Sequence, residues 1–234
     1  MRQIVLDTET TGLAVSKGHR IIEIGCIELV DRRLTGREFH CFLNPDRKIE
    51  EGAERVHGIS DEDLETAPRF ADIVEEFLAF IKDAELVIHN ADFDVGFIEH
   101  ELKLMQHARP KITEHATVLD TLALARKVHP GQRNSLDALC KRYDVDASKR
   151  NVHGALIDAE LLARVYLAMT GGQTALSLDA EIDAAVQAGQ SSVGVREAGD
   201  LNLVVVKASD EEAAAHEAML EKLRDAGDCV WDRA

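Results

Sequence analysis

The first part of the chain consists of short apolar runs followed by a segment with apolar residues at helical spacing. Runs rich in β-branched residues predict strands over 3–8, 20–30 and 37–45. Their short polar connections predict an antiparallel meander. A helix is predicted over 69–82 because five apolar residues recur there at the helical period. They are Phe70, Ile73, Val74, Phe77 and Ile81.

Beyond residue 82 the pattern alternates between strand and helix. The run at 85–90 predicts a fourth strand. Helices are expected over 93–105, 120–128, 135–143 and 155–170. A short strand or turn is expected near 117–119. Ser135 is the expected N-cap of one of these helices. Strands first, then alternating helix and strand, predict an α/β domain on a mixed sheet over residues 1–170.

The pattern changes at Gly171 and Gly172. Residues 171–200 are rich in Gly, Ala, Gln and Ser, which predicts a flexible linker. After it, 201–207 predicts a strand, and 209–227 predicts a capped helix that ends at Gly227. A segment of this size is too small to bury a core alone. We therefore expect residues 201–234 to dock on another surface.

Composition and charge restrict the classes of function. The chain has 234 residues, 45% of them hydrophobic, and a formal net charge of −16. Such a surface does not hold nucleic acid by bulk electrostatics, because phosphate binding rests on Lys and Arg. The four cysteines are too widely spaced to predict a zinc site or a disulfide framework. No apolar run reaches the length of a membrane span, so a cytoplasmic location is expected.

Two acidic residues follow the first apolar run. The strand is expected to end near Asp7, and Glu9 lies on the same face because side chains alternate along a strand. Like charges at this spacing repel unless a cation or a proton neutralises them. Hard divalent cations prefer carboxylate oxygens, so the pair suggests a metal site. The alternative is a strand that ends in a solvated acidic turn.

Three further candidates lie at other element boundaries. Asp94 is at a strand-to-helix junction, His153 comes just before a helix, and Asp158 lies inside that helix. Each has an ordinary structural interpretation: a carboxylate at a helix start, a loop histidine, and a polar-face residue. Together with Asp7 and Glu9 they are more specific, because all could converge at one edge of the sheet.

Three strings, "DTETTGL", "HNADFD" and "HGALIDAE", resemble the exonuclease motifs of the DEDDh family of 3′→5′ exonucleases. This resemblance covers nearly all of residues 1–170. It implies an RNase H-like fold with a five-stranded mixed sheet flanked by helices. The strings "LAMTGGQT" and "CVWDRA" add a similarity to the proofreading subunits of bacterial DNA polymerase III.

The resemblance implies a role for each matching residue. Two Mg²⁺ or Mn²⁺ ions would be held by Asp7, Glu9, Asp94 and Asp158, with His153 as general base. Substrate contacts are implied for Asp7, Glu9, Asp158, Thr10, Thr11, Val56 and His57. Asp92 stands where a small residue is expected. Asp94 is chosen over it because Asp94 follows the phenylalanine of the motif.

The resemblance also implies partners. These are a single-stranded or frayed 3′ DNA end and the polymerase catalytic (alpha) subunit, bound through the tail with Trp231 as an anchor. A weak contact with the sliding clamp is implied for Gln173, Leu176 and Leu178. A small theta-like accessory subunit is left open.

Other activities fit parts of the pattern. A free-standing trimmer of RNA or DNA ends would share the motifs but would need no docking tail. A scaffold with a vestigial acidic site would not need all five catalytic residue types. An endoribonuclease of RNase H type would share the fold without needing His153. The sequence therefore predicts a proofreading exonuclease that yields nucleoside 5′-monophosphates.

Overall fold

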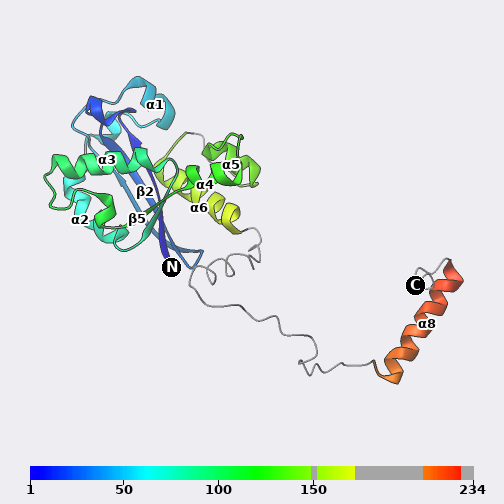
Figure 1. Ribbon diagram of the computed structural model, residues 1–234. Helices are drawn as coiled ribbons and strands as arrows, with labels where there is room; N and C mark the ends of the chain where they lie inside the picture. Colours follow the sequence, from blue (N-terminus) through cyan, green and yellow to red (C-terminus); the bar gives the residue numbers. More distant parts are fainter. Residues whose placement is uncertain (149–151, 172–207, 228–234) are drawn as a thin grey trace. The chain divides into compact units, whose positions relative to one another are not determined.

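The computed structural model describes residues 1–148, 152–171 and 208–227. The chain divides into two units, Met1–Ala175 and Leu176–Ala234, and the first contains a five-stranded sheet of order β3-β2-β1-β4-β5 (Figure 1). The strands are β1 (Arg2–Thr10), β2 (Ile21–Val30), β3 (Arg33–Phe42), β4 (Glu85–Ile88) and β5 (Thr117–Asp120). Neighbours among β1, β2 and β3 pair antiparallel, whereas β4 pairs parallel with β1 and β5. The predicted mixed sheet is confirmed.

Helices cover both faces of the sheet (Figure 1). The helices of the first unit are α1 (Glu51–His57), α2 (Phe70–Ile81), α3 (Ala91–Leu104), α4 (Thr121–Val128), α5 (Leu136–Arg142) and α6 (Ala155–Gly171). Three short 3₁₀ turns lie at Val15–Lys17, Glu62–Leu64 and Ile112–Glu114. On β1, Ile4 and Leu6 pack against α2 and α3, while Val5 packs against α6. The alternation of β1 thus assigns even positions to one core and odd positions to the other.

Two sequence expectations need correction, and one helix was not predicted. β1 does not end near Asp7 but continues to Thr10, because its pairing with β2 persists through Glu9. β3 runs over Arg33–Phe42 rather than 37–45. Its start was missed because its first six residues are all exposed, so they show no alternation of buried and exposed positions. The short helix α1 was not predicted, and it buries only His57.

The described part of the second unit is α8 (Asp210–Ala226). Its predicted cap is confirmed: the Ser209 side chain accepts the N–H of Glu212, whose side chain in turn accepts the N–H of Ser209. The predictions for 201–207, for Gln173, Leu176 and Leu178 of the linker and for Trp231 lie outside the described residues. Among the helices that are described, none is long and apolar enough to cross a membrane.

Candidate active site

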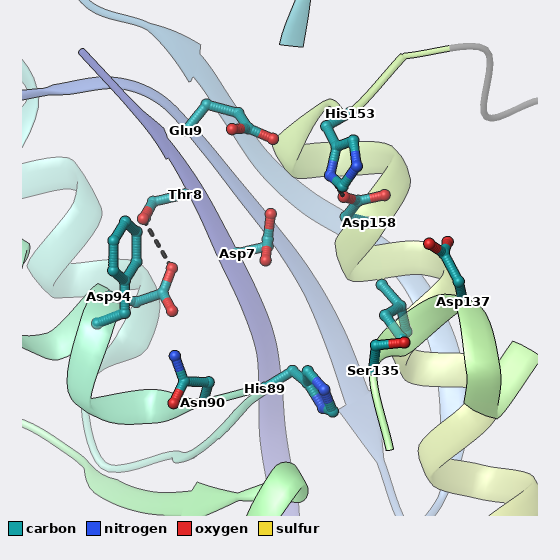
Figure 2. A pocket seen from close by; sticks show the side chains of 12 residues that line it. Asp7, Thr8, Glu9, His89, Asn90, Asp94, Ser135, Asp137, His153 and Asp158 are labelled. Atoms are coloured by element: carbon teal, nitrogen blue, oxygen red, sulfur yellow. Dashed lines mark hydrogen bonds and ion pairs between the residues drawn. The ribbon is translucent and has the colours of Figure 1, made fainter. Parts of the chain in front are cut away.

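One cavity of about 250 Å³ contains all five residues predicted to be catalytic (Figure 2). Its lining comprises Asp7, Thr8, Glu9, His89, Asn90, Phe93, Asp94, Ser135, Leu136, Asp137, His153 and Asp158. Three segments far apart in the sequence, namely β1, the start of α3 and the start of α6, therefore bring their acidic residues to one place.

The β1 carboxylates face α6. Asp7 and Glu9 lie on the odd face of β1, which they share with Val5, and Val5 packs against α6. On the neighbouring strand, Asp7 pairs with Gly25 and Glu9 pairs with Glu23. The shared face predicted for Asp7 and Glu9 is thus realised within a continuous strand.

The start of α6 supplies the second part of the site. Asp158 lies in its first turn and is 3% exposed. The Nδ1 atom of His153 lies 3.3 Å from Oδ2 of Asp158, and the His153 ring is partly exposed. The main-chain N–H of His153 donates to the carbonyl of Val56 in α1 at 3.1 Å. Both side chains are therefore held at the start of α6, in contact with each other.

Asp94 supplies the third part, from the opposite side of β1 (Figure 2). It lies in the first turn of α3, is 3% exposed and accepts a hydrogen bond of 2.7 Å from Thr8 Oγ1. Burial raises the pKa of Asp94 to about 7, because its effect outweighs that of the Thr8 hydrogen bond. A cation bound beside this carboxyl would lower the pKa again, because it favours the ionised form.

Asp92 is exposed and does not line the cavity, which separates it from Asp94. Sequence reasoning missed other lining residues, among them His89, Asn90 and Ser135. Asn90 has a left-handed backbone at the turn from β4 into α3, a conformation in which asparagine is enriched. This preference was the signal available for Asn90, whereas Ser135 was recognised only as a helix cap.

A second cavity of about 270 Å³ shares Glu9 and Phe93 with the first and includes Val56 and His57. His57 is 3% exposed, and its Nδ1 accepts the N–H of Ile59. Its Nε2 is buried with no hydrogen-bond partner among the described residues. Burial lowers the pKa of His57, and nearby His153 acts in the same direction, whereas Glu23 opposes it.

The two threonines after the acidic pair differ in position. Thr10 lines the second cavity, and its hydroxyl donates to the carbonyl of Gly12. Thr11 is fully buried, and its N–H and carbonyl bond to Arg20 and Glu50 inside the protein. Substrate contacts by Thr10 and Thr11 remain predictions, and the arrangement at Thr11 does not favour one through its main chain.

The donor atoms fit a divalent cation. Glu9, His153 and Asp158 each offer a ligand atom, and these atoms lie within 4.8 Å of one another. Asp7 and Asp94 line the same cavity and add further carboxylate oxygens. Oxygen-rich sites of this kind suit hard cations such as Mg²⁺ and Mn²⁺.

Comparison with known proteins agrees with this geometry. The model of the exonuclease family matches residues 4–166. The chain is 54% identical over 237 residues to the DNA polymerase III subunit epsilon of Salmonella typhimurium, covering 98% of this chain and 97% of that one. It is 53% identical to the same subunit of Escherichia coli, with the same coverage.

A solved structure shares the fold. The structure of exonuclease X in complex with 5′ overhanging duplex DNA superimposes with a TM-score of 0.56 at 23% identity, covering 72% of this chain and 91% of that one. The family match and the near-complete relatives imply that divalent metal ions are used. The chain therefore belongs to the exonuclease family and, within it, to the DNA polymerase III epsilon subunits, the proofreading 3′→5′ exonucleases.

Proposed function

We propose that this epsilon-type 3′→5′ exonuclease removes the last nucleotide of a DNA strand as a 5′-monophosphate in the cavity that contains Asp7, Glu9, Asp94, His153 and Asp158. The observation that carries the proposal is that five residues predicted from three separate motifs line one cavity. Because the site attracts phosphate only through cations, it needs no basic surface, which suits a chain of net charge −16.

Asp7, Glu9, Asp94 and Asp158 would hold two divalent cations, Mg²⁺ or Mn²⁺. When bound, such a pair supplies charge neutralisation at the scissile phosphate, orientation of the attacking water and stabilisation of the leaving oxygen. The chain's own part is to fix carboxylates from three elements around one space, with Thr8 holding Asp94 in place.

His153 acts as general base. Its Nδ1 lies against Oδ2 of Asp158, so a proton on Nδ1 would be shared with that carboxylate. The neutral ring then has its lone pair on Nε2, where it accepts the proton of the attacking water. Partial exposure of the ring lets solvent take the proton away afterwards.

The second cavity would receive the terminal nucleotide. It adjoins the first through Glu9 and Phe93, and Val56 and His57 line it on the α1 side. With Nδ1 engaged by the Ile59 N–H, the neutral His57 ring has its proton on Nε2, where it offers a donor. Val56 adds an apolar surface against which a sugar or base packs.

Two neighbouring acids of α3 provide the test of the site. The Asp94→Asn variant should lose Mg²⁺-dependent removal of a mismatched 3′ nucleotide from a 5′-labelled primer. The Asp92→Asn variant should retain it, because Asp92 is exposed and outside the cavity. Normal turnover by Asp94→Asn, or equal loss in both variants, would contradict the assignment.

The partners are proposed from sequence and from the names of the relatives. The division into exonuclease domain (1–170), linker (171–200) and docking tail (201–234) fits a subunit tethered to the polymerase alpha subunit, with Trp231 as a hydrophobic anchor. A subunit that edits the 3′ primer end during bacterial DNA replication would work in the cytoplasm. A theta-like subunit is a further candidate partner. Deleting 195–234 should abolish alpha binding and leave exonuclease activity intact, whereas retained binding would place the interface on the nuclease domain.

A weaker contact with the sliding clamp is proposed for Gln173, Leu176 and Leu178. A short peptide of this kind pays an ordering cost, so its affinity alone should be low and its effect should come from high effective concentration. The triple alanine variant should keep exonuclease activity and alpha binding but lose clamp binding. Unchanged clamp binding would contradict this assignment alone.

A further inference from the structure

Glu23 of β2 is a buried acidic residue next to the proposed catalytic set but outside it. It is 4% exposed, and the sheet register places it directly opposite Glu9. Two carboxylates in such a cross-strand pair repel each other unless each has other partners. The partners of Glu23 therefore indicate why an acid is placed there.

Both carboxylate oxygens of Glu23 have partners within the protein. Oε2 accepts the N–H of Ala155 at 3.0 Å, and Oε1 lies 2.7 Å from Nε2 of His40 on β3. Ala155 is the first residue of α6, and a helix N-terminus has N–H groups without intrahelical acceptors and a partial positive charge. Glu23 thus caps α6 from the sheet, across 132 residues of sequence.

The helix start that Glu23 holds contains part of the proposed catalytic machinery. His153 lies just before Ala155, and Asp158 lies one turn after it, with its N–H bonded to the Gly154 carbonyl. A small displacement of this turn would move both side chains relative to the β1 carboxylates. Proton transfer requires hydrogen-bond geometry, so such a displacement would lower turnover.

Gly25 lets α6 come close enough for this contact. A Cβ atom at position 25 would lie 2.3 Å from both the carbonyl carbon of Ala155 and the nitrogen of Leu156. The start of α6 is therefore packed directly on the backbone of β2. Gly25 sets how near the helix lies, and the Glu23 carboxylate two residues earlier fixes its first N–H.

We propose that Glu23, supported by His40, is a positioning residue that fixes the first turn of α6 and thereby sets His153 and Asp158 against Asp7 and Glu9. The inference rests on the proposed function of the site. Glu23 lines neither of the two cavities, so its contribution to turnover is made through the two residues of the α6 start.

The test compares two buried glutamates of the same strand. The Glu23→Ala variant should lower kcat for a single-stranded 3′ end by about 10- to 100-fold, the range for losing a partner that orients a site residue, with little change in KM. Glu28→Ala removes an equally buried acid whose partners are Arg2 and Arg37. Glu28→Ala should destabilise the fold and leave kcat unchanged. It therefore shows whether loss of stability alone lowers kcat.

The Glu23→Gln variant keeps a carbonyl oxygen for the Ala155 N–H and should recover most of the lost kcat. If Glu23→Ala does not fold, Glu23→Leu takes its place with the same expected loss of kcat, because leucine fills the space but offers the Ala155 N–H no acceptor. Because Glu23 acts through the α6 start, Glu23→Ala should cost less in a His153→Ala background than in the native protein. The proposal would be overturned if folded Glu23→Ala had native kcat or differed from the native protein only in KM. It would also be overturned if the kcat losses of Glu23→Ala and His153→Ala multiplied fully in the double variant.

The Asp94→Asn variant, assayed beside these, separates the two proposals. If Asp94→Asn is inactive and Glu23→Ala has native kcat, the positioning role alone fails. If Asp94→Asn is fully active, the proposed site itself fails.

Discussion

Glu28 and Asp94 are each 3% exposed, but the side chains that bind them differ in charge. Glu28 is bonded to Arg2 at 2.7 Å, to Arg37 at 3.0 Å and to the hydroxyl of Thr35. Burial raises the pKa of Glu28, but these hydrogen bonds and charges outweigh it and lower the pKa overall. At Asp94 burial prevails, and the pKa rises to about 7.

The presence or absence of arginine partners separates the structural carboxylates from those of the site. Glu101 follows the Glu28 pattern, since Arg20 binds it through both Nε and Nη2. At the site, Asp94 is held by a threonine hydroxyl and Asp158 by an imidazole, partners that orient a carboxylate without a permanent positive charge. The protein thus neutralises Glu28 and Glu101 with its own arginines, whereas under the proposed function the site carboxylates are neutralised by divalent cations.

The largest expected effect comes from exchanging one acid in each region for its amide. Asp7→Asn should reduce Mg²⁺-dependent exonuclease activity below detection, because a cation would lose a ligand, and should leave the fold intact. Glu28→Gln should do the opposite, lowering the melting temperature while retaining kcat. Activity on a single-stranded 3′ end and thermal unfolding measure the two effects. An active Asp7→Asn, or an inactive but folded Glu28→Gln, would break the distinction.

Replacing the imidazole partner of Asp158 should give the next largest effect. In His153→Ala we expect kcat to fall by about 10²–10⁴-fold, the usual contribution of a general base. KM should change little, because the base contributes in the transition state. Steady-state kinetics on a short oligonucleotide distinguish the two parameters. A raised KM with native kcat would make His153 a binding residue.

Part of the fold and part of the site were predictable from sequence, for reasons that can be named. The period of a strand is enough to place Asp7 and Glu9 on one face, and the apolar spacing over Phe70–Ile81 is enough to predict α2. Asp94 was distinguished from Asp92 by its place after a phenylalanine, and the structure buries one and exposes the other.

Other features depend on contacts that local sequence does not reveal. Helix α1 has few buried residues, so it lacks the apolar period that predicts a helix. The end of β1 was predicted too early because acidic residues normally mark a strand end, yet pairing with β2 carries the strand to Thr10. The role of Glu23 depends on a bond to a residue 132 positions away.

Divalent cations should raise the melting temperature only when the carboxylates of the site are intact. At about 100 times Kd, binding to the native state adds roughly 2.7 kcal/mol, which is on the order of 5–10 °C in melting temperature for a domain of this size. The native protein and Glu28→Gln should both show this shift with Mn²⁺, and Asp7→Asn should show much less. An equal shift in all three proteins would mean that the cation binds elsewhere.

The smallest expected effect is the pH dependence at Glu28. Because the folded-state pKa of Glu28 is lowered, its ion pairs stabilise the fold above its ordinary pKa of 4.5, and this stabilisation is lost as pH falls below that value. The difference in melting temperature between the native protein and Glu28→Gln should therefore be constant from pH 6 to pH 8 and should shrink below about pH 4.5. A difference that grows on acidification would contradict this sign.

A count of bound Mn²⁺ by electron paramagnetic resonance, with a nucleoside 5′-monophosphate present, tests most directly the claim that the site carboxylates are neutralised by cations. The native protein and Glu28→Gln should each bind two ions per chain, whereas Asp94→Asn should bind fewer. If the native protein binds none, or if Asp94→Asn binds as many as the native protein, the four carboxylates of this cavity do not form the metal site.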